Sequence, residues 1–212
     1  MKSKFFLAAT LVILASCSMK PKFDLDITLN DKSLIDKNMI VSEIRISEGQ
    51  TSDYIYTDTL RIKKDHFTVK LPYEGPALVF VSIPKSDNRF RQILVAEEGK
   101  VSLAIDSNKS VIGGTPLNER WQVYNNESDS ISELFARLDR DGKLAEDTTI
   151  TRRDLLRINT DRIIAFTKEN IDNPIGEYFF INNYTMMPEE RRLEMNLFVS
   201  EKLKKIMHIE IE

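Results

Sequence analysis

Hydrophobic and polar residues alternate along most of the first half of the chain, with the period of two that is typical of strands with one buried face. The pattern is strict over residues 23–29, and a turn cluster follows it at residues 30–32. Similar segments recur at close spacing, and we predict strands over residues 23–29, 39–47, 54–62, 67–71, 77–83, 93–96 and 101–105. Short strands at this spacing favour an antiparallel β-sandwich or barrel.

Three of these segments carry more specific predictions. Residues 77–83 are almost continuously apolar, which is typical of a central strand covered on both faces. The polar turn at residues 63–65 separates segments 54–62 and 67–71, so we expect these two segments to pair as a hairpin.

The pattern changes at residues 111–121, where strand-like sequence gives way to helix-like sequence. Gly113 and Gly114 end the last alternating segment, because glycine tolerates positive φ and close backbone approach. Thr115 followed by Pro116 predicts a helix start, with the threonine hydroxyl accepting from unpaired amides. We predict helices over residues 116–140, from residue 151, over 175–184 and from 188, with a polar segment at 125–129 able to interrupt the first. The fold class is therefore α+β, with an N-terminal antiparallel β-sandwich or barrel-like module at residues 23–114 and a C-terminal helical module at 115–212.

Three side chains in these modules have two interpretations each. Trp121 and Tyr124 share a helix face with Leu117, so they either pack the first helix onto the sheet or form an aromatic platform for a sugar or peptide. Asp58 falls on the apolar face of its strand, where it either marks a site or bonds nearby amides at a bulge or strand end.

The N-terminus has the pattern of a bacterial lipoprotein signal peptide. Lys2 and Lys4 precede an apolar run at residues 5–14, which is too short to span a bilayer, and small residues lead to Cys17. The resemblance to lipoprotein signals implies cleavage of residues 1–16 and acylation of Cys17, including palmitate-type chains, with an ordinary signal peptide as the alternative. Residues 17–22 then form a lipidated tether to the bilayer, and several acyl chains on one residue make attachment effectively permanent. Since no acidic run follows Cys17, we expect the periplasmic face of the outer membrane.

Composition removes several classes of function. The formal net charge is −3, and loss of the two lysines in residues 1–16 makes it about −5, so nucleic acid is not an expected partner. The two histidines, His66 and His208, have no neighbours at zinc-ligand spacing, and no cofactor motif occurs, so we expect no metal and no cofactor. Cys17 is the only cysteine, so a lipidated chain would have no thiol for disulfide exchange.

Three short motifs resemble the Asp-(Ser/Thr)-apolar acceptors of bacterial periplasmic O-glycosylation. They predict modification at Thr59, Ser130 and Thr148. Because three-residue motifs recur by chance, an intact mass equal to that of the unmodified lipoprotein would exclude all three.

The order of these features resembles a domain of unknown function that stands N-terminal to thioredoxin-like domains in gut-bacterial lipoproteins. The resemblance rests on residues 64–69, 95–101, 112–118 and 173–178. The resemblance implies a fold and a location in the cell envelope. It assigns no catalytic residue to this chain. The sequence departs from the family at His66, where glycine is more usual, and it ends at Glu212 without a Cys-x-x-Cys module.

Three functions follow as hypotheses. The first is a non-enzymatic lipoprotein module that binds a periplasmic protein, peptide or glycan. The second is an accessory or truncated relative of a thioredoxin-like thiol–disulfide interchange lipoprotein, and the third is a carboxylate-dependent hydrolase whose acid pair the sequence does not identify.

Overall fold

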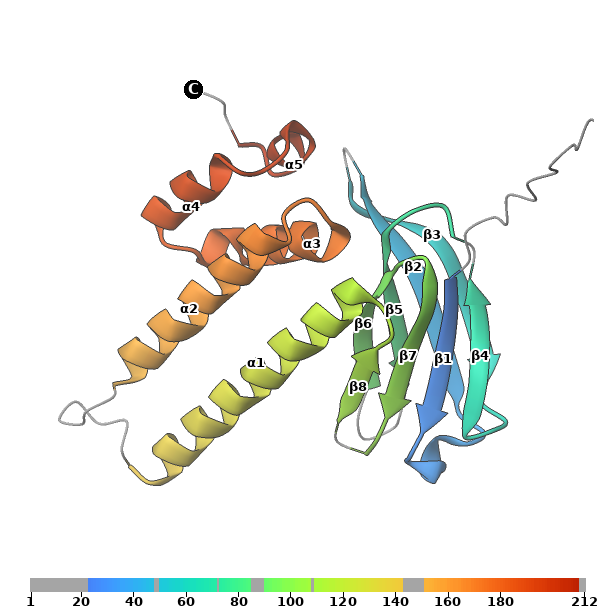
Figure 1. Cartoon of the computed structure of the whole chain (residues 1–212). Helices are drawn as coiled ribbons and strands as arrows, with labels where there is room; N and C mark the ends of the chain where they lie inside the picture. Colours follow the sequence, from blue (N-terminus) through green and yellow to red (C-terminus); the bar gives the residue numbers. More distant parts are fainter. Residues whose placement is uncertain are drawn as a thin grey trace, which may run out of the picture.

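The computed structural model describes residues 23–47, 50–71, 73–84, 90–107, 109–142 and 151–209 (Figure 1). The predicted signal peptide, Cys17, the tether and Thr148 lie outside these residues. Eight strands are followed by helices, which confirms the predicted α+β class. The strands are β1 (Phe23–Leu29), β2 (Asn38–Ser47), β3 (Gln50–Arg61), β4 (His66–Leu71), β5 (Ala77–Ile83), β6 (Phe90–Ala96), β7 (Gly99–Ile105) and β8 (Ser110–Gly113), with a 3-10 turn, η1 (Lys32–Leu34), after β1.

The strands form two four-stranded sheets that face each other. Sheet A has the order β4-β1-β7-β8, and sheet B has the order β3-β2-β5-β6. Strand β5 is central in sheet B, as the apolar run at residues 77–83 predicts. One pair differs from the antiparallel prediction, because β1 and β7 run parallel from Phe23↔Gly99 to Leu29↔Ile105.

The predicted hairpin of segments 54–62 and 67–71 is wrong. Strand β3 pairs with β2 in sheet B, whereas β4 pairs with β1 in sheet A. The chain therefore crosses from one sheet to the other, and Ile62 is buried at the crossing with 1% of its surface exposed. Alternation shows which face of a strand is buried, but it does not show which sheet the strand joins.

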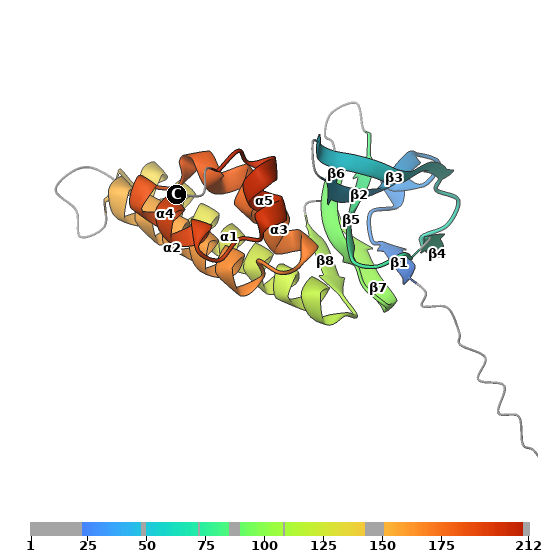
Figure 2. The same ribbon diagram turned by 90° about the horizontal axis from the view of Figure 1, so that it is seen from above.

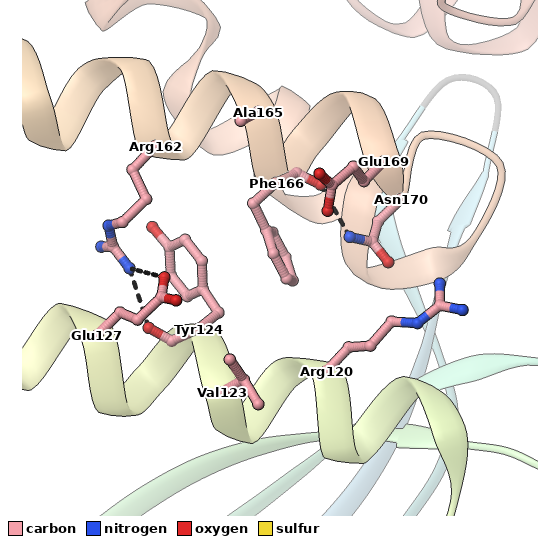
Figure 3. Close-up of a pocket in the computed structure, with 9 residues that line it drawn as sticks. All are labelled: Arg120, Val123, Tyr124, Glu127, Arg162, Ala165, Phe166, Glu169 and Asn170. Carbon is pink, nitrogen blue, oxygen red and sulfur yellow. Dashed lines mark hydrogen bonds and ion pairs between the residues drawn. The ribbon is translucent and has the colours of Figure 1, made fainter.

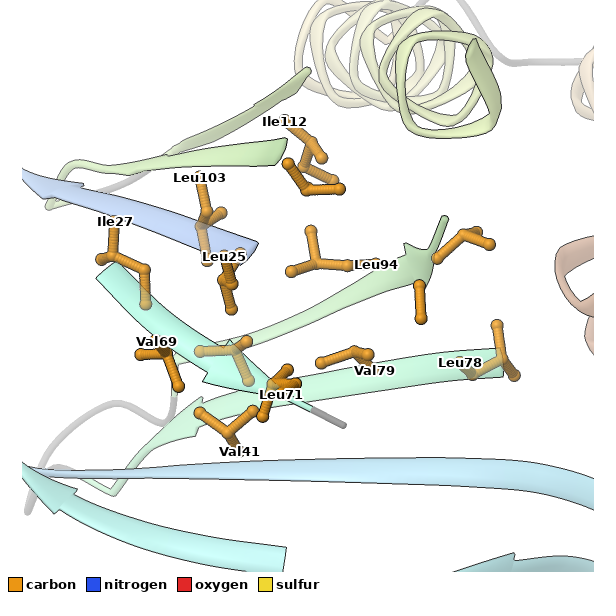
Figure 4. Packing of buried hydrophobic residues seen from close by; sticks show 14 of the residues in the cluster. Leu25, Ile27, Val41, Val69, Leu71, Leu78, Val79, Leu94, Leu103 and Ile112 are labelled. Carbon is orange, nitrogen blue, oxygen red and sulfur yellow. The ribbon is translucent and has the colours of Figure 1, made fainter. Parts of the chain in front are cut away.

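Hydrophobic side chains from the inner faces of both sheets fill the space between them (Figure 4). Leu25, Ile27 and Leu103 of sheet A and Val41, Val79 and Leu94 of sheet B have no exposed surface. Burial of such side chains contributes about 1.5–3 kcal/mol each, so this core is the main source of stability in the β-module.

Helices follow the sandwich in the order α1 (Pro116–Arg140), α2 (Arg152–Glu169), α3 (Pro174–Asn183), α4 (Glu189–Asn196) and α5 (Glu201–Ile206), with a 3-10 turn, η2 (Tyr184–Met186), before α4. Helix α1 has the predicted bounds and continues through residues 125–129, so the polar segment does not interrupt it. Thr151 caps α2 in a capping box with Asp154, and Asn173 caps α3. Among the described residues, none of the helices combines the length and the apolar character needed to cross a membrane.

The helices gather beside strands β6 and β8, and β3 and β4 lie at the opposite side of the sandwich (Figures 1 and 2). Helix α3 also packs on the outer face of sheet B, where the rings of Phe80 and Tyr178 meet edge to face at 6.2 Å. The helices have a second core of their own, formed by Ile164, Ile171, Phe180, Met187, Met195, Val199 and Leu203.

Candidate functional site

Helix α1 is fixed to the sandwich by hydrogen bonds from its side chains to the backbone of the edge strands. Asn118 is fully buried and bonds both backbone groups of Val95 in β6. The indole N–H of Trp121 donates to the carbonyl of Ile93 at 2.8 Å, and the N–H of Ile112 in β8 donates to Gln122 at 2.6 Å. An edge strand leaves backbone groups unpaired, so these side chains satisfy groups that another strand would otherwise bond.

The start of α1 is capped differently from the sequence prediction. Thr115 occupies the N-cap position, but its side chain makes no capping bond and instead accepts from Asn118 Nδ2 at 2.8 Å. The free amides of Leu117 and Asn118 donate to Glu97 Oε2, at 2.9 and 3.3 Å. A carboxylate is favourable at this position because the helix N-terminus carries partial positive charge. Glu97 is therefore the carboxylate that caps this helix.

The glycine prediction at the junction is confirmed at Gly114. Its φ is +93°, and a Cβ there would lie 2.4 Å from the carbonyl oxygen of Lys100. Only glycine combines this backbone conformation with so close an approach to the neighbouring strand.

Trp121 and Tyr124 belong to an aromatic cluster that joins three helices. Both side chains are 7% exposed, and they pack with Phe166 of α2 and Phe179 of α3. The Trp121 and Tyr124 rings stack at 5.5 Å, and Tyr124 lies 4.4 Å from Phe166. The first interpretation from the sequence was packing of the helix onto the sheet. Trp121 makes such a contact through its bond to Ile93 in β6, whereas the ring contacts of Tyr124 are with α1, α2 and α3. Ligand contact at Trp121 and Tyr124 stays a prediction, and Tyr124 also lines a cavity.

That cavity is a cleft of about 310 Å³ between α1 and α2 (Figure 3). Tyr124 and Phe166 lie at its base, while Val123 of α1 is 57% exposed. The lining residues are Arg120, Val123, Tyr124, Glu127, Arg162, Ala165, Phe166, Glu169 and Asn170. The cleft therefore combines an aromatic base with two cations, two carboxylates and an amide.

Arg162 connects the two helices across this cleft. Its guanidinium lies over the Tyr124 ring at 4.0 Å and donates to the Tyr124 carbonyl at 2.9 Å. It also donates to Ser128 at 3.1 Å, and Glu127 lies 3.9 Å away. The buried Nε of Arg162 has no hydrogen-bond partner among the described residues. A buried donor of this kind favours an acceptor from water or a ligand.

The groups in the cleft suit noncovalent recognition. Burial raises the pKa of Tyr124, so its hydroxyl stays protonated at neutral pH. An aromatic base with a few convergent polar groups is typical of small-ligand sites, and Arg and Tyr are frequent in peptide and glycan contacts. Within the described ranges, no three side chains of the His, Cys, Asp and Glu types converge to hold a metal.

The remaining predicted residues lie elsewhere in the structure. Asp58 is partly buried within β3, and its carboxylate accepts a hydrogen bond from the amide of Thr59 at 2.7 Å. This bond agrees with the interpretation that Asp58 bonds nearby amides. Thr59 is exposed on the same strand, and Ser130 is exposed on α1 with its hydroxyl bonded to the carbonyl of Asn126. Modification at Thr59 and Ser130 stays a prediction.

The sequence did not point to Arg162, Phe166 or Asn170 as members of the site. They lie in the second helix, and their relation to Tyr124 depends on how α1 and α2 pack. Spacing in α2 gave one usable signal, because Arg162 and Phe166 are four residues apart and so share a helix face.

Residues 25–121 match the family model described as Domain of unknown function (DUF4369). The chain carries a DUF4369 domain. The matched region extends from β1 to the first turns of α1, so it includes Glu97, Asn118 and Trp121 and ends before Tyr124. No curated protein matches the chain.

Proposed function

We propose that this chain is a lipid-anchored envelope module that binds a ligand without catalysing a reaction, and that the α1–α2 cleft is its binding site. The ligand is a peptide or a glycan from the periplasm. The observation that carries the proposal is the cleft itself, with an aromatic base of Tyr124 and Phe166 and the buried donor of Arg162.

The composition of the cleft supports this ligand class. Two arginines and two glutamates balance in charge, which suits ligands with both donors and acceptors and little net charge. The exposed side chain of Val123 offers apolar area to a ligand, and the rings of Tyr124 and Phe166 are already held by packing, so they lose little side-chain entropy on binding. The proposed location at the membrane rests on residues 1–22. Residues 17–22 would form a short tether that holds the domain close to the bilayer.

The test is a thermal-shift and calorimetric screen of soluble glycans and short peptides against the full-length protein in neutral detergent. Val123→Glu places a carboxylate at the cleft, and Val111→Glu is the matched control, because both valines are 57% exposed and Val111 lies on β8 outside the cleft. We expect Val123→Glu to weaken binding of any hit by about tenfold, through the cost of a misplaced charge, and Val111→Glu to leave it unchanged. Equal binding by both variants would place the ligand elsewhere.

A second candidate is an accessory role beside a separate thioredoxin-like oxidoreductase. It rests on the resemblance to a domain that stands N-terminal to thioredoxin-like domains, and residues 25–121 match a domain of unknown function. Thiol-trapped pulldown from intact cells should enrich such an oxidoreductase with this protein. Absence of enrichment counts against the role, and it leaves the binding proposal standing.

A further inference from the structure

The edge strands at the two sides of the sandwich differ in whether a helix covers them. At one side, Asn118, Trp121 and Gln122 of α1 bond the backbone of the edge strands β6 and β8. At the other side, the edge strands are β3 and β4, and no described helix covers them. Each of these strands pairs on one side only, so one row of its backbone groups has no strand partner.

A groove of about 410 Å³ opens between β3 and β4 at this side. Leu60 and Phe67 are partly buried in it and pack against the core, and Val69 is 7% exposed. This apolar surface is concave and lies at an open sheet edge. It therefore suits a partner that inserts a side chain better than a partner that presents a flat surface.

The groove is basic. Arg61, Lys63, Lys64 and Lys70 line it, and Asp58 is the one carboxylate among the lining residues. Arg61 has a partner in Asp36 at 3.4 Å. Within the described part of the chain, no ion pair joins Lys63, Lys64 or Lys70 to a carboxylate. The excess of positive charge is local, because the chain as a whole has a net charge of −3.

We propose that β4 is a docking edge for an acidic, extended segment of a partner protein, which adds to sheet A as a further strand. Alternate side chains of such a strand point to opposite faces, so apolar ones enter the groove while acidic ones meet the lysines. Strand β4 is the better edge, because its pairing with β1 is regular, whereas the pairing of β3 with β2 contains two register shifts. This site lies across the sandwich from the α1–α2 cleft and does not depend on the function proposed for that cleft.

The experiment measures fluorescence anisotropy of a labelled short peptide that alternates glutamate and valine, with the full-length protein in neutral detergent. We expect saturable binding, and no binding of the same peptide with lysine in place of glutamate. The double variant Lys64→Glu/Lys70→Glu should bind about tenfold more weakly, and Lys64→Arg/Lys70→Arg should bind as the wild type does. Arg153→Glu/Arg157→Glu changes the charge equally on exposed positions of α2, and it should leave binding unchanged.

A peptide that is N-methylated on alternate residues tests strand addition with the wild-type protein alone. It keeps the charge but cannot donate the backbone bonds of an added strand, so we expect its binding to be lost. Equal binding of the methylated or the lysine peptide overturns the proposal. So does a failure of the glutamate peptide to bind, including the case in which vesicles containing phosphatidylglycerol bind through Lys64 and Lys70 instead.

Discussion

The side-chain amide of Asn118 bonds the backbone of Val95 as a neighbouring strand would. The N–H of Val95 donates to Oδ1 at 2.9 Å, and Nδ2 donates to the carbonyl of Val95 at 2.7 Å. Both groups are buried, so neither has water as an alternative partner. Through this contact a helix residue completes the edge of sheet B and fixes the direction in which α1 leaves the sandwich.

Asn118→Ala should therefore be among the most destabilising substitutions in α1. It leaves two buried backbone groups of Val95 unpaired, and each costs about 1–3 kcal/mol. We expect a loss of about 2–4 kcal/mol in the free energy of unfolding, measured by urea denaturation. Asn126→Ala on the exposed face of the same helix is the control and should cost less than about 1 kcal/mol. Similar losses for the two variants would contradict the role given to Asn118.

Gly176 in α3 should not tolerate a side chain. A Cβ there would lie 1.8 Å from the carbonyl oxygen of Asn170, at the turn between α2 and α3. We expect Gly176→Ala to destabilise the protein by about 3 kcal/mol or more, because backbone must move to accommodate it. At Gly113 a Cβ would meet Ser102 at 3.5 Å, an ordinary contact, so Gly113→Ala should change stability by less than about 1 kcal/mol. Thermal unfolding of the two variants gives the comparison.

Asp26 should make stability depend on pH in the acid range. Hydrogen bonds from Lys100, Thr68 and His66 lower the pKa of its carboxyl from 3.8 to about 2. A lowered pKa in the folded state contributes stability above pH 3.8, and that contribution is lost as the pH falls toward 2. Asp26→Asn should cost about 1–2 kcal/mol at neutral pH after allowance for solvent screening, and the difference from wild type should shrink below pH 3.8.

The control for this prediction is Asp24→Asn on the same strand. Within the described residues, no hydrogen bond or ion pair holds the Asp24 side chain. Urea unfolding at a series of pH values should give this variant the acid sensitivity of the wild type. If the free energy of unfolding of Asp26→Asn fell in acid as steeply as that of the wild type, Asp26 would not be the source of the pH dependence.

Glu43 should have the opposite effect. Its side chain is 1% exposed, Oε2 has no hydrogen-bond partner among the described residues, and burial raises its pKa although Arg45 lies 3.8 Å away. A raised pKa means that stability is greatest below the ordinary value of 4.5 and declines as the pH rises through the folded value. Glu43→Gln should therefore stabilise the protein at neutral pH, with no gain at acid pH. Glu74→Gln, at an exposed partner of Arg45, should have little effect at either pH.

Local patterns predicted the elements of this fold well. Alternation gave β1 and the continuous apolar run at residues 77–83 gave β5, both with their observed bounds, and Thr115-Pro116 gave the start of α1. These features depend on neighbouring residues, so a single sequence contains the information for them.

Features that depend on distant residues were predicted less well. Strands β3 and β4 are separated by a short turn but belong to different sheets, because each finds its partner elsewhere in the chain. Glu97 lies 20 residues from the amide of Leu117 that it caps, and Arg162 lies 38 residues from the carbonyl of Tyr124 that it bonds. Such contacts follow from packing, which residue spacing does not encode.

The central proposal is that this chain is a binding module and that it is held at a membrane through Cys17. Mass spectrometry of the N-terminal peptide, released from protein extracted from native membranes, tests it most directly. The account predicts a mature chain that begins at Cys17, with a diacylglyceryl group on its sulfur and an acyl chain on its amine. Recovery of the chain from the aqueous fraction, with an unmodified thiol at Cys17, would contradict it.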